Sequence, residues 1–223
     1  MNRRTNGRCA ALIAAAGKGE RLGLGPKAFL KLGEKTLLER AVAAIAAGVD
    51  EVIVAVPSAH LDEARALLPA ARVVPGRDTR QGTVLAMLEQ TDAQVVLVHD
   101  AARPFLPLRV VHELREAAAA KGAVSASRRV VDTLVNAGSG EPVDREALRA
   151  VQTPQGFWRD LLLQAHQEAA RNGTEATDDT ALVRALGHEI HWCEGSPWLF
   201  KITTPGDFEF ARTLLPAWEA AQQ

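Results

Sequence analysis

The chain contains 223 residues, 47% of them hydrophobic, and its 26 Lys and Arg residues are balanced by 27 Asp and Glu residues, which gives a formal net charge of -1. This length and apolar content suit one large α/β domain with a sizeable core. The balanced charge excludes the large basic excess with which proteins neutralise nucleic-acid phosphates, and no apolar run approaches the length of a membrane span. We therefore expect neither nucleic acid nor a membrane as a partner.

Short apolar runs alternate with amphipathic segments through the first part of the chain. The apolar runs predict strands at 9–16, 51–57, 72–76, 93–104 and 123–130. The amphipathic segments between them predict helices at 35–48, 61–71, 80–90 and 108–122. This alternation predicts a mostly parallel central sheet with helices on both faces and right-handed crossovers.

The pattern changes near residue 130, where two β-like pieces flank the turn-forming segment Asn-Ala-Gly-Ser-Gly at 136–140. These pieces predict a protruding β-arm at about 129–153. Because an isolated two-stranded ribbon is marginally stable in water, we expect the arm to pack against the same arm of a second subunit. Beyond the arm, the patterns predict helices and strand pieces, with helices at 158–173, 177–187 and from Pro205 onward, and strand pieces at 188–195 and 198–203. We interpret residues 1–223 as one domain with a dimerisation arm.

The first residues are superficially typical of a signal peptide, because basic residues precede an apolar run. That run ends in Gly-Lys-Gly-Glu-Arg, however, which favours a first strand followed by a loop. Cys9 and Cys193 lie in apolar surroundings without metal-binding spacing, which is typical of buried free thiols in a reducing compartment. We therefore expect a cytoplasmic protein.

The loop after the first predicted strand, within "LIAAAGKGERLGLGPKAFLKLG" at 12–33, carries glycines and several cations. It lacks the Gly-x-x-x-x-Gly-Lys-Ser/Thr pattern of a P-loop, and the third glycine of a dinucleotide-binding Gly-x-Gly-x-x-Gly arrives one position late. Gly17 and Gly19 permit a close backbone approach, so the N–H groups of this loop can form a nest for an anion. Arg21 and Lys27 then supply two cations for a polyphosphate.

Further segments resemble one family in its own order along nearly the whole chain. They are "AAAGKGERLGLGPKAFLKLGEKTLLERAV" (14–42), "GRDTRQGTVLAML" (76–88), "VLVHDAARPFL" (96–106), "VVDTL" (130–134), "VDREALRAVQTPQGF" (143–157), "TDDTALV" (177–183) and "FKITTPGDF" (200–208). The first resembles the signature of nucleotidyltransferases in general. Together they resemble the 2-C-methyl-D-erythritol 4-phosphate cytidylyltransferase family.

The resemblance implies an α/β, Rossmann-like nucleotidyltransferase fold and a homodimer that exchanges its arms. It implies an enzyme of the non-mevalonate pathway of isoprene biosynthesis that converts CTP and 2-C-methyl-D-erythritol 4-phosphate into 4-diphosphocytidyl-2-C-methyl-D-erythritol and pyrophosphate. Mg²⁺ is the expected cofactor, held mainly by the CTP phosphates and by water, so that no residue is predicted as a metal ligand. Two anions must meet in this reaction, so positioning and charge neutralisation should dominate catalysis.

The same resemblance implies roles for individual residues. Arg21 and Lys27 are expected to act at the α-phosphate and the leaving pyrophosphate, and Arg145 and Lys201 at the methylerythritol phosphate. Arg145, on the arm, is expected to reach the site of the neighbouring subunit. The substrate-binding residues implied are Ala15, Ala16, Gly17, Gly19, Asp78, Arg80, Thr83, Asp100, Ala101, Arg103, Thr133 and Thr153. Asp78 and Thr83 match positions that read cytosine.

In this scheme Asp100 and Arg103 border the ribose and the substrate, while Thr133 and Thr153 assist at the methylerythritol phosphate. The chain departs from the family pattern at Ala28, Arg77, Gly82 and Val131, none of which is an expected catalytic cation. Two other functions stay open at this level. One is a related enzyme with another acceptor, such as ribitol 5-phosphate, and the other is a non-catalytic nucleotide-binding regulator. Asp178 is equally well explained as a helix N-terminal cap.

Overall fold

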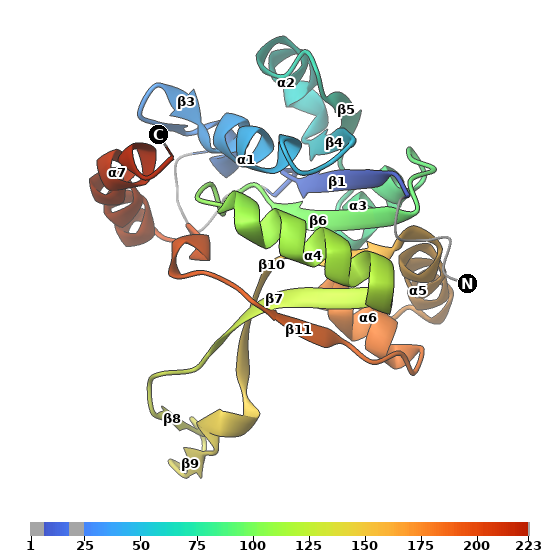
Figure 1. Cartoon of the computed structure of the whole chain (residues 1–223), viewed down its shortest axis with the longest axis vertical. Helices are drawn as coiled ribbons and strands as arrows, with labels where there is room; N and C mark the ends of the chain where they lie inside the picture. Colours follow the sequence, from blue (N-terminus) through green and yellow to red (C-terminus); the bar gives the residue numbers. More distant parts are fainter. Residues whose placement is uncertain (1–6, 18–24, 223) are drawn as a thin grey trace.

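Seven strands form the central sheet in the order β11-β7-β10-β6-β1-β4-β5 (Figure 1). The computed structural model describes residues 7–17 and 25–222. The strands are β1 (Cys9–Ala14), β4 (Glu51–Val56), β5 (Arg72–Pro75), β6 (Val95–Asp100), β7 (Ala123–Arg129), β10 (Arg149–Trp158) and β11 (His191–Glu194). Strand β10 is antiparallel to β6 and β7, and the other neighbouring pairs are parallel. The predicted mostly parallel sheet is therefore confirmed.

Helices cover both faces of this sheet because its strands are apolar on both sides. In β1, Ala11 and Ile13 pack toward the face covered by α1 (Leu37–Ala46), α2 (Leu61–Leu67) and α4 (Leu108–Lys121). Ala10 and Leu12 pack toward the opposite face, which is covered by α3 (Arg80–Leu88), α5 (Arg159–Asn172) and α6 (Asp179–Ala185). Successive side chains of a strand point to opposite faces, so a continuous apolar run is what a sheet buried on both faces requires.

A third apolar cluster lies where the last helix meets the start of the chain. Helix α7 (Pro205–Ala220) contributes Leu215 and Trp218, which pack with Phe105 and with Leu32 of the small hairpin β2 (Lys31–Leu32)–β3 (Lys35–Thr36). Helix α7 begins in a capping box, in which Thr204 and Asp207 each bind the other's backbone N–H. This cluster fixes the segment just before α7 beside the carboxyl edge of the sheet.

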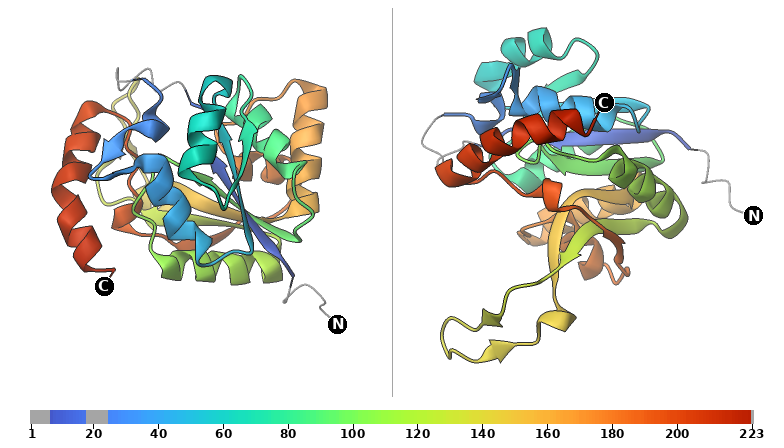
Figure 2. Two further views of the ribbon diagram at one scale, coloured as in Figure 1. Left: turned by 90° about the horizontal axis from the view of Figure 1, so that it is seen from above. Right: turned by 60° about the vertical axis from the view of Figure 1, so that its left-hand side comes forward.

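The predicted arm leaves the sheet as an extension of β7 and returns as β10. It contains the two-stranded ribbon β8 (Leu134–Val135)–β9 (Pro142–Val143) and the 3-10 helix η4 (Arg145–Ala147). Figure 1 and the right-hand view of Figure 2 show the arm standing away from the sheet and its helices. The protruding hairpin is therefore confirmed, and its role in dimerisation stays a prediction.

Three local predictions were incomplete or wrong. Residues 152–158 form the second half of β10 in the middle of the sheet, a strand that the sequence pattern did not predict. Pro154 disfavours a central strand, and the structure accommodates it at an irregularity of the ladder between Val151 and Gln155. Residues 198–203, predicted as a strand, contain the 3-10 helix η5 (Pro197–Leu199) and then irregular chain. The strand predicted at 188–195 covers only His191–Glu194.

Within the described ranges, no helix has both the length and the apolar character that crossing a membrane requires. Both cysteines are free, as predicted, with Cys9 buried and Cys193 partly buried.

Candidate active site

A cavity of about 680 Å³ opens at the carboxyl edge of β1, β4 and β6. Open parallel sheets place their ligand crevices at this edge, because the loops that follow neighbouring strands meet there. The structure brings together in this cavity ten of the predicted site residues: Ala15, Ala16, Gly17, Lys27, Asp78, Arg80, Thr83, Asp100, Ala101 and Lys201. Gly19 and Arg21 lie outside the described residues.

The loop after β1 forms one wall of the cavity, and it packs closely against the loop after β5. A Cβ atom on Gly76 would lie 2.2 Å from Cβ of Ala16, so only glycine fits at this point. The backbone of Ala15 donates to the carbonyl oxygen of Ala55 at 2.9 Å, which ties the loop to the end of β4. Gly76 lies in one of the family-like segments but was not predicted as a site residue, because its contact with Ala16 joins segments distant in sequence.

Lys27 enters the cavity from the 3-10 helix η2 (Lys27–Phe29). Its Nζ donates to the carbonyl oxygen of Ile202 at 2.8 Å, next to Lys201. Phe29, in the same turn, stacks on His60 with ring centroids 4.7 Å apart. Two of the four predicted catalytic cations, Lys27 and Lys201, therefore lie together at the cavity although they come from opposite ends of the chain.

Asp100 is the last residue of β6 and lies on the floor of the cavity, between two cationic side chains. Its carboxylate lies 2.8 Å from Nζ of Lys201 and 3.4 Å from Nε of Arg80. Burial alone would raise the pKa of Asp100, but the charges of Arg80 and Lys201 outweigh burial and hold this pKa well below its usual range. Asp100 is therefore an anion that positions two cations at the cavity floor.

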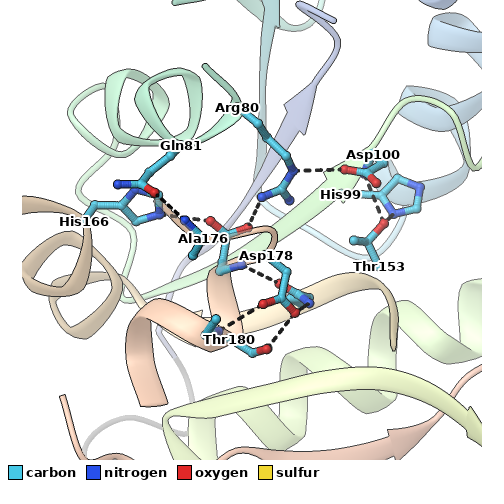
Figure 3. Close-up of polar contacts among 12 residues, drawn as sticks. Arg80, Gln81, His99, Asp100, Thr153, His166, Ala176, Asp178 and Thr180 are labelled. Carbon is cyan, nitrogen blue, oxygen red and sulfur yellow. Dashed lines mark hydrogen bonds and ion pairs between the residues drawn. The ribbon is translucent and has the colours of Figure 1, made fainter. Parts of the chain in front are cut away.

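Thr153 and His99 support Asp100 from beneath (Figure 3). The Thr153 hydroxyl accepts the backbone N–H of Asp100 at 3.1 Å and donates to Nδ1 of His99 at 3.1 Å, while Nε2 of His99 donates to the carbonyl oxygen of Arg103 at 3.0 Å. Burial lowers the pKa of His99 to about 4, so this ring is neutral near pH 7. Thr153 was predicted to bind substrate; in this structure it is buried and its hydroxyl is used within the protein.

Arg103 also lies behind Asp100 rather than on the cavity surface. Its guanidinium donates to the carbonyl oxygen of Leu199, and its Nε is 3.9 Å from the Asp100 carboxylate. Burial lowers the pKa of Arg103, against the opposing effect of Asp100. This side chain links the strand end to η5, the segment that precedes Lys201.

The loop before α3 forms the opposite rim. Asp78 and Arg77 are exposed there, and the Thr79 side chain caps the helix by accepting the Gly82 N–H at 3.0 Å. The buried hydroxyl of Thr83 accepts the Arg77 N–H and donates to the Thr79 carbonyl oxygen, each at 2.9 Å. Thr83 therefore shapes this loop, and Arg77, noted in the sequence only as a departure from the family pattern, adds a cation to the cavity lining.

Thr133 and Arg145 are not brought to the cavity of their own chain. Both lie on the exposed arm, where the Arg145 guanidinium donates to the carbonyl oxygen of Val131 at 2.6 Å. The arm therefore separates two predicted site residues from the cleft residues described above.

The sequence interpretation missed Asp179, whose signal was the second acidic residue of "TDDTALV". The neighbouring Asp178 caps α6, as its residue type suggested, by accepting the Ala181 N–H at 3.0 Å. Asp179 is instead buried, 2.8 Å from Nη1 of Arg80 and 2.9 Å from Nε2 of His166. Burial alone would raise its pKa, but Arg80 and His166 hold the pKa of Asp179 below its usual range.

The cavity offers few of the side chains that usually bind a metal ion. Among the described residues, no three His, Cys, Asp or Glu side chains gather as metal ligands would. The floor offers one carboxylate, Asp100, already paired with two cations, and the rim offers Asp78. Mg²⁺ takes few protein ligands when phosphate oxygens and water supply the others, and such a site is compatible with this donor set.

A glycine-containing loop after the first strand, two lysines and an acidic strand end meet in one cleft of a mostly parallel sheet, which is the architecture of a nucleotide-binding α/β enzyme. A family model described as "IspD: 2-C-methyl-D-erythritol 4-phosphate cytidylyltransferase" matches residues 9–217. The chain belongs to this family, a family of nucleotidyltransferases in the non-mevalonate pathway.

Individual relatives agree with the family match. The chain is 52% identical to a 2-C-methyl-D-erythritol 4-phosphate cytidylyltransferase of Deinococcus radiodurans, over 93% of this chain and 89% of the relative. It is 45% identical to one of Thermus thermophilus, over 94% and 98% of the two chains. The crystal structure of the enzyme from Thermus thermophilus superposes with a TM-score of 0.82 at 41% identity, over 92% of this chain and 98% of that chain.

Proposed function

We propose that the cleft binds CTP and 2-C-methyl-D-erythritol 4-phosphate side by side and joins them with release of pyrophosphate. The observation that carries this proposal is the meeting of Lys27 and Lys201 at one cavity, with Nζ of Lys27 bonded to the carbonyl oxygen of the residue after Lys201. A site that must bring two anions together needs such paired cations. Lys201 is paired with Asp100 at 2.8 Å, so its ammonium is positioned before substrate arrives.

The proposed reaction uses these cations and the expected cation Arg21. The triphosphate of CTP lies against the loop after β1 and Lys27, and its ribose lies beside Asp100. A phosphate oxygen of the methylerythritol phosphate attacks the α-phosphorus of CTP, a new P–O bond forms, and the bond to the pyrophosphate oxygen breaks. Lys27 and Arg21 stabilise the charge on the α-phosphate and the leaving group, and Lys201 holds the attacking phosphate. The attacking phosphate is already ionised near neutral pH, so no general base is required.

Cytosine lies toward the rim formed by Asp78 and the loop that Thr83 supports. Mg²⁺ would be held mainly by the CTP phosphates and by water, with Asp100 as the carboxylate on the cavity floor that could assist, and it would neutralise part of the charge of the triphosphate.

The arm completes the site in a homodimer. Five of its apolar side chains, at Val131, Leu134, Val135, Val143 and Val151, are 37–70% exposed in the single chain. Apolar side chains gathered on one projection are typical of a protein interface. In the dimer, Thr133 and Arg145 of one arm serve the methylerythritol phosphate in the cleft of the neighbouring subunit.

The test is pyrophosphate release from CTP with a purified acceptor. We expect turnover with 2-C-methyl-D-erythritol 4-phosphate and Mg²⁺, and at least a tenfold lower rate with ribitol 5-phosphate, which offers a phosphate on a different polyol. Absence of turnover with the first acceptor would overturn the proposed reaction. Equal turnover with both would overturn the acceptor assignment while leaving the nucleotidyl transfer in place. Light scattering at micromolar concentration tests the dimer separately, and a monomer would contradict it.

A further inference from the structure

Arg80 joins the cleft to a buried charged pair that the proposed reaction does not use. Its Nε lies 3.4 Å from Oδ1 of Asp100 in the cleft, and its Nη1 lies 2.8 Å from Oδ2 of Asp179 behind it. Figure 3 shows Arg80 reaching Asp100 on one side, with His166 on the other side of the network. The planar fork of an arginine can contact carboxylates on two sides through different nitrogen atoms, a geometry that the compact ammonium of a lysine does not reproduce.

We propose that Asp179 and His166 are positioning residues that hold the guanidinium of Arg80, and through it the carboxylate of Asp100, in the orientation that binds CTP. This proposal rests on the proposed place of the CTP ribose beside Asp100. Asp179 and His166 do not touch the cavity surface that Asp100 presents, so they act only through Arg80.

The burial of Asp179 makes its partners necessary. Its side chain is 1% exposed, and a buried carboxylate without compensating charges is strongly destabilising. Arg80 supplies the charge, and the ring of His166 supplies a hydrogen bond of 2.9 Å to Oδ1. The backbone N–H of Asp179 is held separately, because it donates to Oε1 of Gln155 at 3.3 Å. Asp179 is therefore fixed from three directions, and its carboxylate points at Arg80.

His166 donates a hydrogen bond to the carboxylate of Asp179. A carboxylate oxygen is only an acceptor, so Nε2 of His166 carries the proton in this contact. Its Nδ1 has no hydrogen-bond partner among the residues that the structure describes. The His166 side chain is fully buried on α5. Among the described residues, its ring therefore makes its hydrogen bond to Asp179. The ring thus links α5 to the first turn of α6, where Asp179 lies.

The alternative is a purely structural role, in which the pair only joins α5 to α6. A structural role changes the free energy of unfolding but leaves the KM for CTP unchanged in the folded enzyme. A positioning role raises the KM for CTP more than it lowers kcat at saturating CTP, because a tilted Asp100 weakens nucleotide binding.

The experiment measures kcat and the KM for CTP of the full chain in four variants. We expect Asp179→Asn, which keeps the shape but removes the charge, to raise this KM about 10-fold. Arg80→Lys keeps the charge but loses the fork, and we expect a similar rise. His166→Leu should raise the KM about 3-fold, whereas His166→Gln, whose amide can donate to Asp179, should restore most of the loss.

Val183→Ala is the matched control, because Val183 is fully buried on the same helix but belongs to the apolar core. It should lower stability without raising the KM for CTP. The proposal is overturned if the variants of Asp179, Arg80 and His166 have KM values within twofold of that of Val183→Ala. If Asp179→Asn does not fold, Arg80→Lys and the comparison of His166→Leu with His166→Gln decide the question.

Asp100→Asn separates this proposal from the proposed function. A wild-type enzyme that releases no pyrophosphate contradicts the function itself. A raised KM for CTP in Asp100→Asn, without a change in Asp179→Asn and Arg80→Lys, would leave the function in place and exclude the positioning role.

Discussion

The cleft and the arm both carry residues expected to bind substrate, but their surroundings differ. Asp100 on the cleft floor is nearly enclosed and lies within 2.8 Å of Lys201, whereas Val131 and Val135 on the arm are more than half exposed. Contacts within one chain orient the charges of the cleft before a ligand binds, which lowers the cost of reorganisation during reaction. The arm presents apolar surface instead. Its residues therefore need a further contact, the one that we propose a second subunit provides.

Lys27→Ala should have the largest effect, because it removes a cleft cation and its bond to Ile202. We expect kcat to fall by about 10²- to 10³-fold, the range typical of losing one group that stabilises transition-state charge. Steady-state pyrophosphate release measures it. Lys31→Ala removes an exposed lysine of the neighbouring hairpin and should leave kcat unchanged. Full turnover of Lys27→Ala would contradict the proposed mechanism.

Arg145→Ala tests whether the arm acts across subunits. We expect kcat/KM for the methylerythritol phosphate to fall about 10²-fold, because the phosphate loses a charged donor. Mixing Arg145→Ala with Lys27→Ala should then recover activity. A mixed dimer contains one intact site if the arm crosses, formed by the cleft of the first chain and the arm of the second.

Random reassortment makes half of the dimers mixed, so about a quarter of wild-type activity should return. The measurement is the same pyrophosphate assay, made after subunit exchange or co-expression. Recovery would establish that the arm completes the cleft of its partner. Activity no higher than the average of the two separate variants would show that Arg145 acts within its own chain.

His99, which is buried at the cleft floor, makes the stability of the protein depend on pH. Burial lowers the pKa of His99 to about 4, from 6.5 in the unfolded chain. The unfolded chain therefore binds the proton more strongly between these values, so this stabilisation is complete above pH 6.5 and is lost as the pH falls toward 4. We expect a loss of about 2 kcal/mol in unfolding free energy between pH 7.5 and pH 5.

Urea denaturation at the two pH values measures this loss. His99→Gln should remove most of the pH dependence in this window, because glutamine does not titrate. His188→Gln, at an exposed histidine, should retain it. An unchanged pH dependence in His99→Gln would mean that other groups dominate.

We expect the smallest effects when the aspartate that caps a helix is removed, either beside the central sheet or on the arm. Asp178→Ala removes the cap of α6 and should cost about 1 kcal/mol, because α6 packs in the core. Asp144→Ala removes the cap of the exposed turn η4 and should cost less than about 0.5 kcal/mol. Denaturant midpoints measure both. Equal losses would show that the arm is as firmly coupled to folding as the body.

The elements that the sequence predicted well are those whose apolar pattern has one interpretation. Continuous runs such as "CAALIA" and "VVLVHD" became central parallel strands because both faces of the sheet are covered. The segment around Pro154 was missed as a central strand, since its fit depends on an irregular ladder with β7. Residues 198–203 were wrongly predicted as a strand, because their apolar side chains pack with Phe105 and α7 and not in a sheet.

The residues of the cleft were likewise predicted only in part. Lys27, Asp100 and Lys201 were predicted from motifs, and the structure brings them to one cavity. Asp179 and His166 were not predicted as site residues, because their relation to Arg80 depends on the packing of α5 and α6 against α3. Thr153 and Thr83 carry predicted binding hydroxyls that the folded chain uses internally.

By itself, the sequence determined the family, the alternation of strands and helices, and the cations that an anionic substrate pair requires. These properties depend on residue type and on spacing along the chain, and both can be read from the sequence alone. Only the tertiary structure decided which charges meet, that Arg80 bridges Asp100 to the buried Asp179, and that Arg145 lies away from its own cleft. Burial and pairing of charges arise when distant segments pack together, so no local pattern can encode them alone.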